Sequence, residues 1–171
     1  MEPILAILMG IGLSAACGFR VFVPLLIMSI AAHTGHLHLA KSFEWIGSDF
    51  AIAAFGLATA LEIAGYYIPW VDHFLDTVAT PAAIVAGIIV TASMVSDMSP
   101  ILKWTLAVIA GGGAAGLVQG ATVLTRGASG VTTAGLANPV VATAELGGSI
   151  FTSLLAIFVP VLAVILIVLF I

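Results

Sequence analysis

The chain has 171 residues, of which 62% are hydrophobic and 7% are charged, and its formal net charge is −4. A soluble domain carries about 25% charged residues because its surface must be solvated, so this composition excludes an ordinary water-soluble fold. The few basic residues form no block, which argues against nucleic acid as a partner and against a polybasic anchor on a lipid surface.

The apolar runs are continuous and long, as expected of helices that span a bilayer, and they lack the alternation of membrane β-strands. The sequence therefore predicts an all-α, polytopic bundle of about five transmembrane spans with broken or re-entrant segments. We expect a single integral membrane domain over residues 1–171. Membrane lipid is its first expected partner.

The first candidate span, residues 3–32, is longer than the roughly 20 residues that a span needs. A tract of small residues ends at Gly18, and Arg20 and Pro24 follow it. Glycine weakens a helix and proline removes a backbone donor, so a break near Gly18 and Pro24 is predicted. The alternative is one long tilted helix whose small face packs against a neighbour.

A polar connection follows over residues 33–49 and contains His33, His36 and His38. Imidazole groups bind zinc, copper or nickel, but no cysteine accompanies this cluster. We therefore favour solvated loop histidines, and we expect neither a metal nor a cofactor.

The second span, residues 50–67, contains one acidic residue, Glu62, two turns before its end. A carboxylate inside the hydrocarbon region is costly and by default indicates a functional site. Asp72 and Asp76 follow, four residues apart, so they share one face of a short interfacial helix turn.

The third span is predicted at residues 80–97, with Thr80 as the helix cap and Pro81 at the first helical position. Ser99 and Pro100 repeat this arrangement ahead of the fourth span, residues 101–124. The fourth span contains glycines at spacings of four, which allow close approach of helix backbones; they are Gly112, Gly116 and Gly120.

The stretch 126–148 is rich in Gly, Thr, Ser and Asn, and Arg126 and Glu145 are its charged residues. The pair Asn138 and Pro139 lies in its middle. A re-entrant segment buried in protein fits this composition, because irregular backbone is tolerated at membrane depth only there or beside water. An extramembrane loop fits equally well. The last span, residues 150–171, is uniformly apolar, and Pro160 is expected to kink it.

Two pairs of segments resemble each other. Residues 5–12 align with 106–113, and residues 29–35 align with 129–135. The sequence thus predicts repeat units 1–70 and 101–171 on either side of the span at 80–97. With an odd number of spans between them, the units would be inverted, which is typical of proteins with a transport site at the membrane midplane.

Three segments together resemble a family of small bacterial membrane proteins catalogued as domain of unknown function 4126. They are Gly12-Leu13-Ser14-Ala15-Ala16-Cys17-Gly18, Ile68-Pro69-Trp70-Val71-Asp72 through Asp76, and Thr133-Ala134-Gly135-Leu136-Ala137-Asn138-Pro139 with Glu145. The resemblance covers nearly the whole chain. It implies a multi-pass protein of the bacterial inner (cytoplasmic) membrane and assigns no activity.

The buried charges favour a small transporter or channel for an ion or small polar solute, with its site between the two halves. The residues expected along this path are Arg20, Glu62, Asp72, Asp76, Asn138 and Glu145. Those expected to break or pack helices are Gly18, Pro24, Gly112, Gly116 and Pro139. The structural alternative is an ion pair between Arg20 and Glu62 that only fixes helix packing.

A second interpretation is a lipid- or quinone-binding membrane protein, or an accessory subunit of a membrane assembly. An enzyme is not expected, because the chain contains neither an HExxH nor a GxSxG motif. The glycine faces make a homo-oligomer plausible.

Overall fold

The structure, a computed structural model, describes residues 3–96 and 98–171, without the side chains of Pro69, Trp70, Asp72 and His73. Over these residues the fold is helical and contains no strand. The α-helices are α1 (Pro3–Phe19), α2 (Phe22–His33), α3 (Asp49–Tyr66), α4 (Pro69–Met94), α5 (Pro100–Leu106), α6 (Gly113–Thr133), α7 (Asn138–Phe158) and α8 (Pro160–Phe170). A 3₁₀ segment, η1 (Lys41–Gly47), precedes α3, and a π-helical segment, η2 (Ala107–Gly112), joins α5 to α6.

The described chain has four helices that are long and apolar enough to cross a membrane. They are Asp49–Tyr66, Phe74–Met94, Pro100–Thr133 and Asn138–Phe158. This confirms the all-α membrane fold. The predicted count of five is not confirmed, because α1, α2 and α8 are shorter apolar helices.

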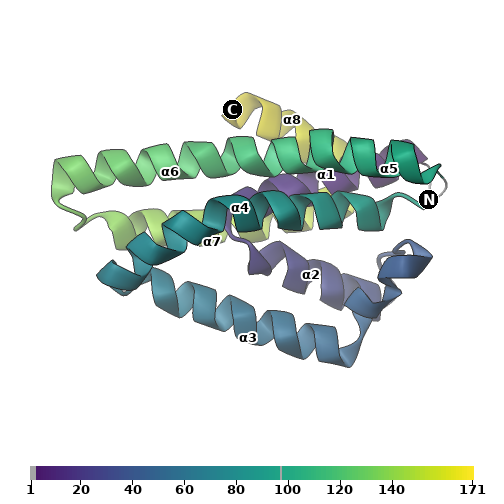
Figure 1. Ribbon diagram of the computed structural model, residues 1–171, viewed down its shortest axis with the longest axis horizontal. Helices are drawn as coiled ribbons and strands as arrows, with labels where there is room; N and C mark the ends of the chain where they lie inside the picture. Colours follow the sequence, from purple (N-terminus) through teal and green to yellow (C-terminus); the bar gives the residue numbers. More distant parts are fainter. Residues whose placement is uncertain (1–2, 97) are drawn as a thin grey trace.

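The first predicted span is a hairpin inside the bundle (Figure 1). Helix α1 runs from the end of the molecule that carries the N-terminus to the middle, and α2 returns to the same end. Accordingly, Pro3, Leu39 and Val95 line one cavity at that end. The predicted break is confirmed, but it falls at Arg20 and Val21: Gly18 lies within the last turn of α1 and Pro24 within the first turn of α2.

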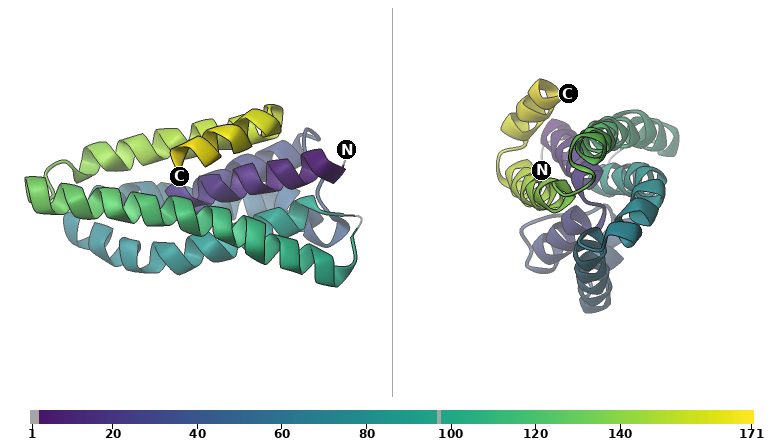
Figure 2. Two further views of the ribbon diagram at one scale, coloured as in Figure 1. Left: turned by 90° about the horizontal axis from the view of Figure 1, so that it is seen from above. Right: turned by 90° about the vertical axis from the view of Figure 1, so that its left-hand side faces the viewer.

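Helix α1 is the centre of the bundle, with α4, α6, α7 and α8 packed around it (Figure 2). Its small residues make this possible because they let neighbouring backbones approach closely. A Cβ on Gly12 would lie 2.7 Å from that of Ala156, and one on Gly18 would lie 2.5 Å from the carbonyl oxygen of Ala115. Leu13 is fully buried among these contacts.

Buried serines fix α1 to its neighbours by hydrogen bonds. Ser14 Oγ donates to the carbonyl oxygen of Gly87 at 2.7 Å, and it lies 2.8 Å from Thr91 Oγ1, both on α4. Ser149 Oγ of α7 donates to the carbonyl oxygen of Ala16 at 3.1 Å. Such polar contacts hold helices together in lipid, where the hydrophobic effect does not drive their association.

The third span begins earlier than predicted. Helix α4 starts at Pro69, so Thr80 and Pro81 lie in its interior and do not open it. Pro69 occupies the first turn, where a missing N–H is harmless. Pro81 is tolerated further along because neighbouring groups in membrane bundles satisfy the backbone that proline frees.

The fourth span is longer than predicted. Segments α5, η2 and α6 form one continuous helix of 34 residues, Pro100–Thr133. Its length of about 51 Å exceeds the roughly 30 Å thickness of the hydrocarbon core of a bilayer. Gly112 and Gly116 face Ile88 and Ile84 of α4, as a packing role requires, whereas a Cβ on Gly120 would meet nothing within 4 Å.

Both predictions for residues 126–148 are wrong. This stretch contains the last turns of α6, a tight turn and the first half of α7. Ala134 (φ 51°) and Gly135 (φ 82°) make the turn, and Pro139 lies in the first turn of α7, where proline is favoured. Of the polar side chains that indicated irregular backbone, Arg126 and Glu145 are buried, whereas Thr132 and Thr143 are exposed and donate hydrogen bonds to carbonyl oxygens of their own helices.

The last predicted span is divided rather than kinked. Helix α7 ends at Phe158, and α8 begins at Pro160 and folds back along the bundle (Figure 1). Its end reaches the tip of the α1–α2 hairpin, where the rings of Phe170 and Phe19 lie 5.2 Å apart.

The inverted repeat is not confirmed. The unit 1–70 begins with the shorter helices α1 and α2, whereas the unit 101–171 ends with the shorter helix α8. The span expected between them at 80–97 is part of α4.

Candidate functional site

Arg20 lies in the turn between α1 and α2, in the middle of the bundle, and its side chain is 1% exposed. Its Nη2 donates to the carbonyl oxygen of Ala142 at 2.8 Å and lies 3.5 Å from Glu145 Oε2, both on α7. Its Nε and Nη1 have no hydrogen-bond acceptor among the described residues. The break in the first span therefore carries a guanidinium into the core.

Glu62 of α3 caps α2. Its Oε1 accepts a hydrogen bond from the backbone N–H of Val21 at 2.8 Å, and its Oε2 accepts one from Phe22 at 3.1 Å. The first N–H groups of a helix need such acceptors, and a negative charge there is favoured by the helix dipole. Val21, the N-cap residue, provides no side-chain cap. The structure does not show the ion pair of Arg20 and Glu62 that was the structural alternative. Arg20 lies beside Glu145, and Glu62 accepts hydrogen bonds from backbone N–H groups.

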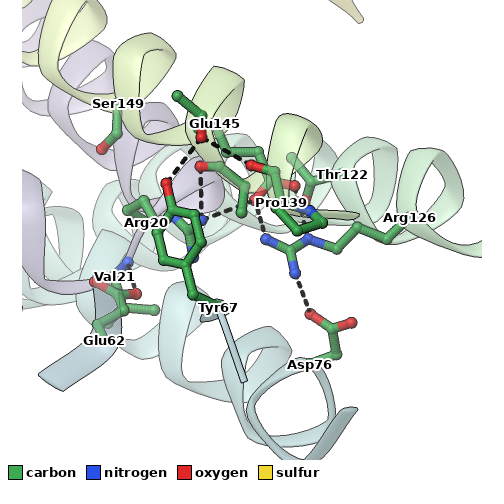
Figure 3. Close-up of polar contacts among 12 residues, drawn as sticks. Arg20, Val21, Glu62, Tyr67, Asp76, Thr122, Arg126, Pro139, Glu145 and Ser149 are labelled. Atoms are coloured by element: carbon green, nitrogen blue, oxygen red, sulfur yellow. Dashed lines mark hydrogen bonds and ion pairs between the residues drawn. The ribbon is translucent and has the colours of Figure 1, made fainter. Parts of the chain in front are cut away.

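Arg126 of α6 connects α7 and α4 (Figure 3). Its Nε donates to Glu145 Oε1 at 2.8 Å, and its Nη2 donates to Glu145 Oε2. Its Nη1 lies 3.4 Å from Asp76 Oδ1. Arg126 and Glu145 are 5% and 6% exposed, whereas Asp76 is 27% exposed. Two-point pairs of this kind fix geometry as well as charge.

Tyr66 of α3 links the two arginines. The guanidinium carbon of Arg20 lies 3.7 Å from the centroid of its ring, and that of Arg126 lies 4.2 Å from it. Cations are attracted to aromatic faces, most strongly where water is excluded, and Tyr66 is 6% exposed. We call Arg20, Glu62, Tyr66, Asp76, Arg126 and Glu145 the ion network.

Two cavities adjoin this network. The α6–α7 cavity has a volume of about 480 Å³ and is bounded by Asp76 and Arg126. The α3–α4 cavity has a volume of about 330 Å³ and is bounded by Glu62 and Tyr66. Four of the six members of the network thus border a space large enough for a small molecule.

The structure brings together four of the residues expected along the path: Arg20, Glu62, Asp76 and Glu145. Asn138 lines the α6–α7 cavity beside them. The side chain of Asp72 lies outside the described residues. Sequence reasoning did not include Arg126 or Tyr66. An isolated arginine between apolar segments was the available signal for Arg126, whereas a tyrosine near the end of a span ordinarily indicates only the membrane interface.

The histidines of residues 33–49 lie apart from the network. His33 Nδ1 is 3.0 Å from the carbonyl oxygen of Gly47, and His36 Nδ1 is 3.0 Å from Thr34 Oγ1. Among the residues that the structure describes, no group of three or more His, Cys, Asp or Glu side chains is placed to hold a metal ion.

These features define an all-helical membrane protein with an internal α1–α2 hairpin and a charged network in its core. A family described as "Domain of unknown function (DUF4126)" matches residues 7–171, and the chain belongs to this family. The resemblance found in the three sequence segments is thereby confirmed. No curated protein and no solved structure matches the chain.

Proposed function

We propose that the protein is a small membrane transporter or channel for an ion or small polar solute, and that its path passes through the ion network. The observation that supports this most is the position of the network. It lies at the tip of the α1–α2 hairpin and borders two cavities. One is lined by Asp76 of α4 and Arg126 of α6, and the other by Glu62 and Tyr66 of α3.

The cost of burying charges favours a functional role for the ion network over a role in helix packing alone. Ionisable groups within a bilayer are expensive and mark ion or substrate paths, whereas well-packed apolar residues stabilise a core at least as well as buried ion pairs do. A break in a membrane helix likewise presents backbone groups to a solute. In this chain both features occur at one place, because the helix breaks at Arg20 and the carboxylate of Glu62 accepts hydrogen bonds from the next two backbone N–H groups.

The network contains contacts of two kinds. The pair of Arg126 and Glu145 is short and two-pointed, whereas Arg20 lies 3.5 Å from Glu145 and Arg126 lies 3.4 Å from Asp76. Charge-assisted hydrogen bonds are usually 2.7–2.9 Å long. We infer that the two long contacts are the ones that a solute replaces during passage, while the short pair holds α6 and α7 together.

Flux measurements in proteoliposomes test the proposal. A panel of inorganic ions and small polar solutes is applied under a concentration gradient to wild type and to Glu62→Gln. Glu44→Gln serves as the matched control because Glu44 is exposed on η1. We expect flux of at least one solute that falls at least tenfold in Glu62→Gln and persists in the control. Absence of flux across the panel, or equal flux in all three proteins, contradicts the proposal.

A second candidate function is the binding of a lipid or quinone, as a single protein or as an accessory subunit of a membrane assembly. The α3–α4 cavity supports it, because its lining includes Leu61 and Val78, which are 63% and 46% exposed on the outer surface of the bundle. An apolar molecule could enter there directly from the bilayer. Mass spectrometry of the purified protein tests this: a stoichiometric lipid or quinone that is lost in Leu61→Trp supports it, and its absence contradicts it.

Three expectations accompany the proposal. We propose that the protein resides in the bacterial cytoplasmic membrane, as its family resemblance implies, and that it forms a homo-oligomer. The inverted repeat also stays a prediction. The proposed path does not depend on it, since the network is built from α3, α4, α6, α7 and the hairpin turn.

A further inference from the structure

We propose that the α6–α7 cavity binds a small zwitterion, whose oxyanion contacts Arg126 and whose cationic nitrogen contacts Asp76. This inference rests on the proposed function, because it names the class of solute that the path would take.

The cavity presents two opposite charges side by side in an otherwise apolar space. Arg126 Nη1 and Asp76 Oδ1 are 3.4 Å apart, and both residues line the cavity together with Asn138. Its remaining walls are formed by Val123, Gly127, Gly130, Val131, Ala134 and Gly135. The volume of about 480 Å³ accommodates a molecule with several non-hydrogen atoms.

Charge balance selects the class of ligand. A lone anion would compete with Glu145 and Asp76 for Arg126 and would add to the three carboxylates of the network. A lone cation would compete with Arg126 for Asp76 and would lie beside a guanidinium. A zwitterion adds no net charge, and each of its ends meets an opposite charge. An α-amino acid carries its ammonium and carboxylate on one carbon, so its charges are as close together as those of Arg126 and Asp76.

Glycines keep the cavity open. A Cβ on Gly127 or Gly130 would meet nothing within 4 Å, so close helix packing does not explain the absence of a side chain at either position. The same is true of Gly120, which lies on α6 outside the cavity. Because Gly130 lines the cavity and Gly120 does not, we expect a leucine at position 130 to reduce the cavity volume and one at position 120 to leave it unchanged. Leucine also favours helix formation over glycine, which keeps both variants foldable.

Two sources supply this chemistry: a dissolved zwitterion and the headgroup of a zwitterionic phospholipid. In phosphatidylethanolamine the phosphate would take the place of the carboxylate. A membrane protein is exposed to both sources. The experiment therefore needs one arm for each.

In the first arm, equilibrium binding of radiolabelled L-alanine and of glycine betaine is measured on the purified full-length protein in detergent, with propionate and ethylamine as competitors that carry one charge each. In the second arm, the protein is purified from nanodiscs with or without phosphatidylethanolamine, and retained lipid is measured by native mass spectrometry. Both arms compare wild type with Gly130→Leu, Gly120→Leu and Asp76→Asn, each checked for a monodisperse gel-filtration profile.

We expect at least one zwitterion to bind. Propionate and ethylamine should each compete with an affinity at least tenfold weaker than that of the zwitterion. Binding should fall at least tenfold in Gly130→Leu and Asp76→Asn and stay unchanged in Gly120→Leu. Retention of the phospholipid alone identifies the headgroup as the source. The inference is overturned if no zwitterion binds in either arm, if a single-charge competitor binds as tightly, or if Gly130→Leu binds like wild type. Flux of an inorganic ion that depends on Glu62, without zwitterion binding, would overturn this inference and leave the proposed function standing.

Discussion

Arg126 of α6 and Glu145 of α7 face each other across the helical hairpin in a two-point ion pair, with Nε 2.8 Å from Oε1. Both side chains are buried, and Glu145 is also the carboxylate nearest to Arg20, at 3.5 Å. One carboxylate thus contacts two guanidiniums. This arrangement makes Glu145 the residue on which the charge balance of the interior depends.

Glu145→Gln should therefore be more harmful than Arg126→Met. Loss of one partner of a buried ion pair costs about 3–5 kcal/mol, because it leaves the other charge uncompensated. In Glu145→Gln, Arg20 loses the carboxylate beside it and Arg126 keeps only Asp76 at 3.4 Å, whereas in Arg126→Met Glu145 retains Arg20. Unfolding in mixed micelles measures both. The combined variant Arg126→Met/Glu145→Gln should lose less stability than the sum of the two single losses; strictly additive losses would argue against a coupled pair.

The cap on α2 is tested by replacing Glu62. Glu62→Ala removes both acceptors for the N–H groups of Val21 and Phe22, whereas Glu62→Gln retains one. Each unsatisfied buried donor costs about 1–3 kcal/mol, so Glu62→Ala should be the less stable protein. Hydrogen exchange should accelerate at the amides of Val21 and Phe22. Unchanged exchange at these two amides in Glu62→Ala would show that the carboxylate does not cap the helix.

Close packing around α1 predicts opposite effects of alanine at two glycines. Gly18→Ala places a Cβ 2.5 Å from the carbonyl oxygen of Ala115 and 2.9 Å from the backbone nitrogen of Gln119. Because backbone atoms cannot easily move away, we expect a loss of about 1–3 kcal/mol. Gly113→Ala meets nothing within 4 Å and should gain up to about 1 kcal/mol of helix stability. Thermal unfolding in detergent compares the two, and equal midpoints would contradict the packing described for Gly18.

Tyr66 provides a test of the contact between its ring and the two arginines. Tyr66→Phe retains the aromatic face, whereas Tyr66→Leu removes it. A desolvated cation–π contact contributes about 2 kcal/mol, so Tyr66→Leu should unfold at a clearly lower denaturant concentration than Tyr66→Phe. If the two variants are equally stable, the ring face does not contribute.

Much of this fold could be predicted from local signals. Long apolar runs predict membrane helices, and the small residues before Arg20 predict the break in the first span. The direction of the chain after that break could not be predicted, because a kinked span and a hairpin have the same composition. The hairpin depends on contacts between segments far apart in the sequence, such as Ser14 with Gly87 and Ser149 with Ala16.

In the candidate site, likewise, the sequence identifies several of the charged residues but does not identify their partners. Rare charges in apolar sequence identify Arg20, Glu62 and Glu145, since each is costly in lipid. Their partners are set by how the helices pack. Glu62 contacts backbone N–H groups that exist only because α2 begins beside it, and Arg126 joins the network only because α6 continues to Thr133.

The re-entrant hairpin is the central claim, because it carries Arg20 into the bundle and places the start of α2 beside Glu62. Cysteine labelling with a membrane-impermeant maleimide in oriented vesicles tests it most directly. Single substitutions are made at exposed sites, Pro3→Cys, His36→Cys and Leu136→Cys, with the wild type as control because Cys17 is buried. We predict that Pro3→Cys and His36→Cys react from one side of the membrane and Leu136→Cys from the other. Reaction of Pro3→Cys from the same side as Leu136→Cys would mean that residues 3–32 cross the membrane, which would contradict the hairpin.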